Sequence, residues 1–228
     1  MRMGQKMNKA IGLHNPNFSL DHQGIKEYQR AFYNLNEREL LDASLERSEG
    51  TEGVGGTLLV TTGKFTGRSP KDKYIVLSKS NESEIWWENN SKMEAEFFVN
   101  LYRDMLAFIA DKDLFIQDLY AGADPKNRIN VRVISELVWH NLFIRHLLIK
   151  PEISKLENFV SDFTIINIPS FQAIPKKHGC RTETVIAINL EEKLVLIGGT
   201  EYAGENKKAV FTILNYLLPK KGILPMHC

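Results

Sequence analysis

The sequence has few cysteines and no long apolar segment. Cys180 and Cys228 are its two cysteines, and they lack C-x-x-C spacing, so they indicate no disulfide framework. No run approaches the roughly 18 apolar residues of a membrane span, and the N-terminus is basic and polar. We therefore expect neither a transmembrane helix nor a secretory signal, and we predict a protein of the reducing cytoplasm.

Net charge is also nearly absent. The chain carries 29 Lys and Arg side chains against 28 Asp and Glu, which leaves a net charge of +1. Proteins that bind nucleic acids or membrane surfaces normally have a basic excess, so we expect neither partner. A length of 228 residues with 43% hydrophobic side chains is enough to bury the core of one large soluble domain or two small ones.

Several motifs of nucleotide and metal chemistry are missing. Gly63-Lys64 is followed by Phe65, so the phosphate-loop pattern G-x-x-x-x-G-K-[ST] fails there, and no other stretch satisfies it. There is no G-x-G-x-x-G, no G-x-S-x-G, and no H-E-x-x-H or Cys/His cluster. The chain therefore contains no recognisable nucleotide-binding motif and no self-sufficient metal site.

Strand and helix signals interleave along the chain. Helices are predicted after Asn36, which caps together with Glu39, behind a capping box of Ser91 and Glu94, after Ser135, and over 204–218. Residues 1–34 are expected to form a loose arm with at most one short strand or helix. Apolar, β-branched runs predict strands at 57–61, 73–77, 115–120, 130–134, 163–168, 184–189 and 193–197, the last two as a hairpin. The pattern predicts a single α/β domain with a mixed β-sheet flanked by helices.

The predicted helix over 204–218 carries an unusual pair of cations. Lys207 and Lys208 lie near its N-terminus, and Tyr202 precedes it after the small residues Gly198 and Gly199. The helix dipole is positive at that end, so cations there are unfavourable by about 0.3–1 kcal/mol. The lysine pair therefore indicates a place for an anion, which free backbone N–H groups at the helix end would help to bind.

Arg68 and His227 are the other candidate residues. Arg68 lies in a glycine-rich loop between the strands at 57–61 and 73–77, and a guanidinium binds carboxylate or phosphate through two parallel hydrogen bonds. His227 is a candidate metal ligand or acid–base group. Ordinary explanations also exist: a solvated lysine pair, a half-buried Tyr202, a lone terminal histidine, and an ion pair between Arg68 and Asp72. The residues alone leave both explanations open.

Three stretches together carry a resemblance to a known family. They are TGKFTGRSPKDKYIV at 62–76, LYAGADPKNRINVRVISELVWHNLF at 119–143 and GGTEYAGENKKAVFTILNYLLPKKGILPMHC at 198–228. In sequence, order and separation they resemble the N-terminal domain of ATP-dependent phosphoenolpyruvate carboxykinase. The resemblance implies the fold of that domain. It also implies a part in converting oxaloacetate and ATP to phosphoenolpyruvate, CO2 and ADP, a carboxy-lyase reaction of gluconeogenesis.

The same resemblance implies cofactors and roles for the candidate residues. The family needs ATP with Mg2+ and favours a second divalent ion, usually Mn2+. By position, Arg68 would bind the carboxylate of oxaloacetate or phosphoenolpyruvate, Tyr202 would line the substrate and CO2 pocket, and Lys207 would lie beside it. Lys208 would be a ligand of Mn2+ and a contact to the γ-phosphate. His227 would be the second protein ligand of that metal.

The sequence departs from the family in two ways. Asn206 stands where methionine is usual and Ala209 where glycine is common, and we expect neither to carry a polar role. In the family the chain continues past the final His–Cys pair into a mononucleotide-binding domain with the phosphate loop, an aspartate of the metal shell and another substrate arginine. We therefore expect residues 1–228 to be the N-terminal, substrate-binding domain, inactive without that partner domain. The alternative is a stand-alone, non-catalytic anion-binding module from a truncated gene.

Overall fold

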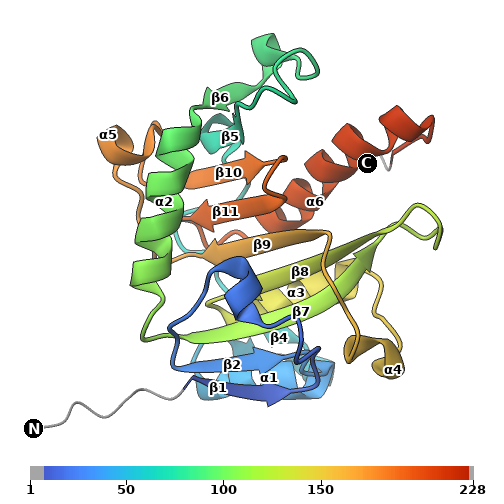
Figure 1. The fold of residues 1–228 in the computed structure, drawn as a ribbon. Helices are drawn as coiled ribbons and strands as arrows, with labels where there is room; N and C mark the ends of the chain where they lie inside the picture. The colour runs from blue at the N-terminus through green and yellow to red at the C-terminus, as the bar shows by residue number, and fades with distance from the viewer. Residues whose placement is uncertain (1–7, 226–228) are drawn as a thin grey trace, which may run out of the picture.

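A nine-stranded mixed β-sheet forms the centre of the computed structural model, which describes residues 8–225 (Figure 1). Across the sheet the strands follow the order β1-β2-β7-β8-β9-β11-β10-β5-β6. Neighbouring strands are parallel except for the antiparallel pairs β7–β8 and β10–β11. The predicted α/β class with a mixed sheet is confirmed.

The elements have the following bounds. The sheet contains β1 (Lys9–Gly12), β2 (Arg30–Tyr33), β5 (Lys73–Val76), β6 (Ser91–Met93), β7 (Asp113–Ala121), β8 (Ile129–Ser135), β9 (Phe163–Ile168), β10 (Val185–Asn189) and β11 (Leu194–Gly198). A separate two-stranded ribbon consists of β3 (Thr51–Glu52) and β4 (Leu58–Leu59). The helices are α1 (Glu37–Glu46), α2 (Ala95–Phe108), α3 (Val138–Leu147), α4 (Ile153–Leu156), α5 (Pro175–His178) and α6 (Gly204–Leu217).

Helices cover both faces of the sheet, because the central strands are apolar on both sides. In β9 the side chains of Ile166 and Ile168 pack in a core with α2, whereas Ile165 packs in a second core with α6. Alternate residues of a strand point to opposite faces, so α2 and α6 lie on opposite sides of the sheet (Figure 1). A strand buried on both faces reads as a continuous apolar run, which explains why the sequence signal for β9 was clear.

Of the three helix N-caps predicted from the sequence, the structure confirms one and contradicts two. The arrangement at Asn36 is confirmed as a capping box: its Oδ1 accepts the Glu39 N–H at 3.0 Å, and Glu39 Oε2 accepts the Asn36 N–H at 2.8 Å. The box at Ser91 is wrong, because Ser91 belongs to β6 and α2 begins at Ala95. The cap at Ser135 is also wrong, because Ser135 ends β8 and α3 begins at Val138. In both cases the serine that the local pattern assigned to a helix cap pairs with a neighbouring strand instead.

The segment before residue 35 is more ordered over its described part than the expected loose arm with one short strand or helix. β1 and β2 extend the sheet at its edge, with β2 in parallel register against β7 from Arg30↔Asp113 to Tyr33↔Ile116. Burial drives this pairing, since Ala31 is 0% and Tyr33 1% exposed. By contrast, the strand predicted at 57–61 is shorter than expected, because only the two residues of β4 form it.

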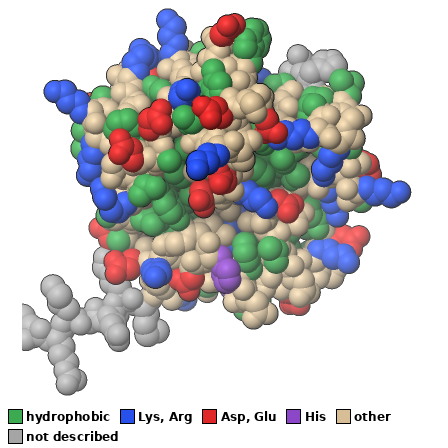
Figure 2. Space-filling model, turned by 45° about the horizontal axis from the view of Figure 1, so that its top comes forward, with side chains coloured by type: hydrophobic (Ala, Val, Ile, Leu, Met, Phe, Trp, Pro, Cys, Tyr) green, Lys and Arg blue, Asp and Glu red, His purple; other side chains and the backbone are tan. Residues whose placement is uncertain are grey.

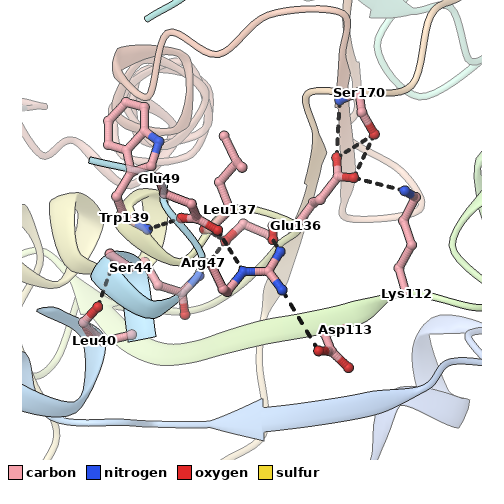
Figure 3. Close-up of polar contacts among 12 residues, drawn as sticks. Leu40, Ser44, Arg47, Glu49, Lys112, Asp113, Glu136, Leu137, Trp139 and Ser170 are labelled. Atoms are coloured by element: carbon pink, nitrogen blue, oxygen red, sulfur yellow. Dashed lines mark hydrogen bonds and ion pairs between the residues drawn. The ribbon is translucent and has the colours of Figure 1, made fainter. Parts of the chain in front are cut away.

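A distant carboxylate caps α3 in place of Ser135 (Figure 3). Glu49 Oε2 accepts the Trp139 N–H at 3.2 Å, and the other Glu49 oxygen pairs with Arg47 Nε at 2.7 Å. Burial raises the pKa of Glu49, and the Arg47 guanidinium opposes that rise. The Glu136 carboxylate nearby accepts bonds from the Ser170 N–H and hydroxyl and from Lys112. These contacts join the end of α1 to the start of α3 and the loop after β9.

One ion pair is entirely buried within the sheet. Arg132 on β8 donates from Nε to Asp118 Oδ1 at 2.7 Å and from NH2 to Oδ2 at 3.0 Å, and both side chains are 0% exposed. The remaining guanidinium N–H groups reach the Phe18 carbonyl at 2.8 Å and Gln23 Oε1 at 3.3 Å. Arg132 therefore ties the N-terminal segment to the β7–β8 pair.

Replacing Arg132 tests how much the fold depends on this pair. Arg132→Met leaves Asp118 buried without its partner, so we expect a loss of about 3–5 kcal/mol in the free energy of unfolding. Urea unfolding measures it. The matched control is Arg38→Met, which breaks the exposed i,i+4 pair with Asp42 and should cost less than about 1 kcal/mol. Equal losses in the two variants would contradict the prediction.

Candidate anion-binding site

The turn between β11 and α6 brings the backbone close to a neighbouring segment. Gly199 has φ +72, and a Cβ there would lie 2.4 Å from the Glu183 carbonyl oxygen, so only glycine fits. After the turn, the Tyr202 N–H donates to Thr200 Oγ1 at 3.1 Å. The sharp turn directs the chain from the end of β11 into the N-terminus of α6.

A buried polar network of His140, Asn167 and Asn206 contacts the backbone of this turn at Glu201. His140 Nε2 lies 2.8 Å from the Glu201 carbonyl oxygen, an acceptor, so this nitrogen carries the proton. Asn167 Nδ2 then donates to His140 Nδ1 at 3.2 Å and to Asn206 Oδ1 at 3.0 Å. His140, Asn167 and Asn206 are all 0% exposed. The expectation that Asn206 carries no polar role is wrong, because its side chain completes this network.

The network depends on a neutral imidazole. Burial lowers the pKa of His140 from 6.5 to about 4, and the bond to the Glu201 carbonyl and the charge of Glu136 oppose that shift. The unfolded chain therefore binds a proton at His140 between these two values and the folded chain does not. Stability contributed by the neutral form is complete above pH 6.5 and is lost as the pH falls toward 4.

Glu205 joins α6 to the loop that carries Arg68. The carboxylate is 4% exposed, and its Oε1 accepts the Ser69 N–H at 2.6 Å. Burial raises the pKa of Glu205, and the bond from Ser69 and the charges of Arg68 and Lys73 oppose that rise. The contact fixes the loop against the first turn of the helix.

Arg68 is not engaged by the acidic residue of its own loop. Asp72 accepts bonds from Arg181 NH2 and from the Thr182 hydroxyl, each at 2.9 Å. The ion pair between Arg68 and Asp72, which the residues alone left open, is therefore wrong. Among residues 8–225 the Arg68 guanidinium has no hydrogen-bond or ion-pair partner.

A cavity of about 560 Å³ opens beside Arg68 and α6. Arg68, Lys73, Glu205 and Lys208 line it, together with apolar side chains that include Ile75, Ile85 and Phe211. Within the described part of the chain Arg68, Lys73 and Lys208 form no ion pair, and Lys208 Nζ lies 4.1 Å from the centre of the Phe211 ring. Three cations thus surround a cavity in which Glu205 is their nearby carboxylate, an arrangement suited to binding an anion.

The structure brings together some of the predicted site residues and not others. Arg68 and Lys208 line the same cavity, whereas Tyr202 and Lys207 do not line it. The Tyr202 ring packs against Gly204, where a Cβ would lie 2.5 Å from ring Cε1. His227 lies outside the described residues, so its expected role as a metal ligand stays a prediction.

Two residues of the site carried only weak sequence signals. Lys73 is one of several basic residues around the Arg68 loop, and Glu205 is one of two acidic residues near the helix start. What distinguishes them is burial and contact with segments far away in the chain, which spacing alone does not reveal. No group of three or more His, Cys, Asp or Glu side chains suited to a metal ion occurs in residues 8–225.

The outer surface agrees with the small net charge. On the face shown in Figure 2, Lys and Arg side chains are interspersed with Asp and Glu and form no broad basic area. Within the described range no helix has the length and apolar character to cross a membrane.

The fold and cavity define an α/β domain with a cationic pocket, and comparison with known proteins supplies the family. The phosphoenolpyruvate carboxykinase family model matches residues 29–228. The chain is 62% identical over 214 residues to phosphoenolpyruvate carboxykinase (ATP) of Ruegeria pomeroyi, covering 94% of this chain and 40% of that protein. It is 55% identical over 218 residues to the enzyme of that name from Cereibacter sphaeroides strain ATCC 17029, covering 96% of this chain and 41% of that protein. The chain belongs to the ATP-dependent phosphoenolpyruvate carboxykinase family and spans about 40% of the length of these relatives.

The His140 network predicts a specific loss of stability in acid. Between about pH 7 and pH 5 the neutral His140 should account for a fall of roughly 2 kcal/mol in the free energy of unfolding. His140→Gln, which cannot titrate, should show a correspondingly smaller fall, whereas the exposed His146→Gln should retain the wild-type slope. Urea unfolding across this pH range measures both. A His140→Gln slope equal to that of the wild type would rule out His140 as the cause.

The Glu205 contact predicts a difference between two substitutions. Glu205→Ala leaves the buried Ser69 N–H without an acceptor and should cost about 1–3 kcal/mol of unfolding free energy. Glu205→Gln keeps an acceptor oxygen at the same position and should be clearly more stable than Glu205→Ala. Denaturant unfolding of the two variants side by side makes the comparison. Equal stability would show that the bond to Ser69 contributes nothing.

Proposed function

We propose that this chain forms the substrate-binding part of the active site of a phosphoenolpyruvate carboxykinase (ATP). The reaction converts oxaloacetate and ATP to phosphoenolpyruvate, CO2 and ADP. The observation that carries the proposal is that Arg68 and Lys208, far apart in the sequence, line one cavity without an ion-pair partner among residues 8–225. Family membership and the names of the relatives support the same function.

Each residue has a role that its chemistry suits. Arg68 binds the substrate carboxylate through two parallel hydrogen bonds, and no residue between 8 and 225 occupies its guanidinium. Lys208 contacts the transferred phosphoryl group. Tyr202 precedes α6 and Lys207 lies in its first turn. Neither lines the cavity, and we assign both to the CO2 side of the substrate, outside the cavity wall. Phosphoryl transfer is accelerated mainly by positioning and by neutralisation of charge, which these cations supply.

The family uses ATP and divalent metals, and this chain supplies only part of a metal shell. Lys208 is a metal ligand when its amine is neutral, and we assign His227 as the second protein ligand. The described residues offer no cluster of three acidic, histidine or cysteine ligands, so the remaining ligands must come from outside residues 8–225. A bound divalent ion would neutralise charge on the phosphates.

We further propose that residues 1–228 act together with a mononucleotide-binding domain. The 228 residues contain no phosphate-loop pattern, and the chain covers about 40% of the length of its relatives. An alternative function, a non-catalytic anion-binding module, is favoured by one observation: residues of this chain place three cations around one cavity. The coding sequence after Cys228 distinguishes them, because an in-frame phosphate loop supports the enzyme and a stop codon supports the module.

The carboxylate role of Arg68 is testable in a joined protein. The 228 residues are fused to the remaining part of the Ruegeria pomeroyi relative, and carboxykinase turnover is measured in both directions. Arg68→Ala removes a charge-assisted double hydrogen bond, so the Michaelis constant for oxaloacetate or phosphoenolpyruvate should rise about tenfold or more.

Two controls accompany this measurement. Lys71→Ala changes an exposed cation of the same loop that does not line the cavity, and it should leave the constant unchanged. The 228-residue chain without the fused part should show no turnover. An inactive fusion would overturn the proposed function, and an unchanged constant in Arg68→Ala would overturn the role of Arg68.

A further inference from the structure

Lys73 occupies a position where the sheet would ordinarily place an apolar side chain. It begins β5 and pairs in parallel register with Ile186 of β10. Tyr74 packs in the core that contains α2, whereas Ile75 packs in the core that contains α6. Lys73 and Ile75 share a face because side chains alternate along a strand, so the Lys73 stem lies on the α6 side, within the cavity.

The Lys73 ammonium has no hydrogen-bonding partner in the part of the chain that the structure describes. Among residues 8–225 it forms no hydrogen bond and no ion pair, although the side chain is only partly exposed. Burial lowers the pKa of Lys73, the charges of Arg68 and Lys208 lower it further, and Glu205 opposes them. A partly desolvated amine beside two other cations is unfavourable unless something else neutralises it.

The carboxylates that line the cavity are already engaged. Glu205 accepts the Ser69 N–H through Oε1. Glu84, which also lines the cavity, accepts bonds from the Tyr216 hydroxyl and from Lys220. Three cations therefore face one nearby carboxylate, and a ligand with two negative charges would restore neutrality.

We propose that Lys73 is a third cationic contact of the substrate, acting with Arg68 and Lys208, and that it selects ligands with two anionic groups over monocarboxylates. The inference rests on the proposed function for the identity of the ligand. Oxaloacetate has two carboxylates, and phosphoenolpyruvate has a carboxylate and a phosphate. Arg68 can bind one of these anionic groups, and the second group then needs another cation, which Lys73 supplies. Lys73 touches substrate in this assignment and lowers its dissociation constant.

Binding to the 228-residue chain tests the role of Lys73 directly. Phosphoenolpyruvate and acetate are titrated separately by calorimetry, with tryptophan fluorescence as a second readout because Trp86 lines the cavity. Lys73→Gln should weaken phosphoenolpyruvate binding about tenfold while leaving acetate binding nearly unchanged. Lys73→Arg restores the charge and should recover most of the affinity for phosphoenolpyruvate. Lys79→Gln, an exposed cation outside the cavity, is the matched control.

Stability of the ligand-free variants separates a binding role from a structural one. If Lys73 serves the ligand, Lys73→Gln removes a repulsive charge and should unfold at an equal or higher urea concentration than the wild type. A lower midpoint together with equal losses for both ligands would show a structural role and overturn the proposal.

The inference and the proposed function fail in different ways. Phosphoenolpyruvate affinity that is unchanged in Lys73→Gln but reduced in Arg68→Ala overturns the role of Lys73 and leaves that of Arg68 intact. An absence of phosphoenolpyruvate binding by the wild-type chain also overturns the role of Lys73. The proposed function is judged separately, by turnover of the fused protein.

Discussion

The geometry of the site depends on one hydrogen bond, from the Ser69 N–H to the Glu205 carboxylate at 2.6 Å. The bond joins the loop before β5, which carries Arg68, to the first turn of α6, which carries Lys208. A buried carboxylate is costly, but here it accepts a backbone N–H and lies near two cations. The same side chain therefore orders the loop and limits the repulsion between the cations while no anion is bound.

A second constraint comes from the layers of the sheet. The core between the sheet and α6 is apolar along most of its length, and it becomes cationic where β5 begins and α6 starts. A protein interior can hold such charges only near its edge, where water or a ligand reaches them. The polar network of His140, Asn167 and Asn206 lies beneath the turn at Glu201 and holds the start of the helix rigid without adding charge, because the imidazole is neutral.

The sequence predicted the central parts of the fold better than its edges. β9 and the β10–β11 hairpin have continuous apolar runs, and the cap at Asn36 lies within four residues, so local patterns were sufficient. For residues 1–34 the sequence predicted no more than one short strand or helix, because β2 is placed by pairing with β7, far along the chain, and β1 by pairing with β2. The caps proposed at Ser91 and Ser135 failed for a related reason, since strand pairing is a non-local effect that outweighs a side-chain cap. Motifs singled out Arg68 and Lys208, which line one cavity, whereas Glu205 and Asn206 make buried contacts that no local pattern encodes.

The long sequence separation between contacting segments also sets the order in which the site forms during synthesis. Synthesis runs from the N-terminus, so Ser69 exists 136 residues before the carboxylate that holds it, and β5 waits for β10 before it can join the sheet. Contacts between such distant segments form late and slowly, because a long loop must first be closed. A nascent chain that has not reached β10 therefore exposes the edge of β5, and one that has not reached α6 lacks the carboxylate that holds the loop around Arg68. Shielding of that edge from other chains, by chaperones or by fast translation, is a requirement that this topology places on the cell.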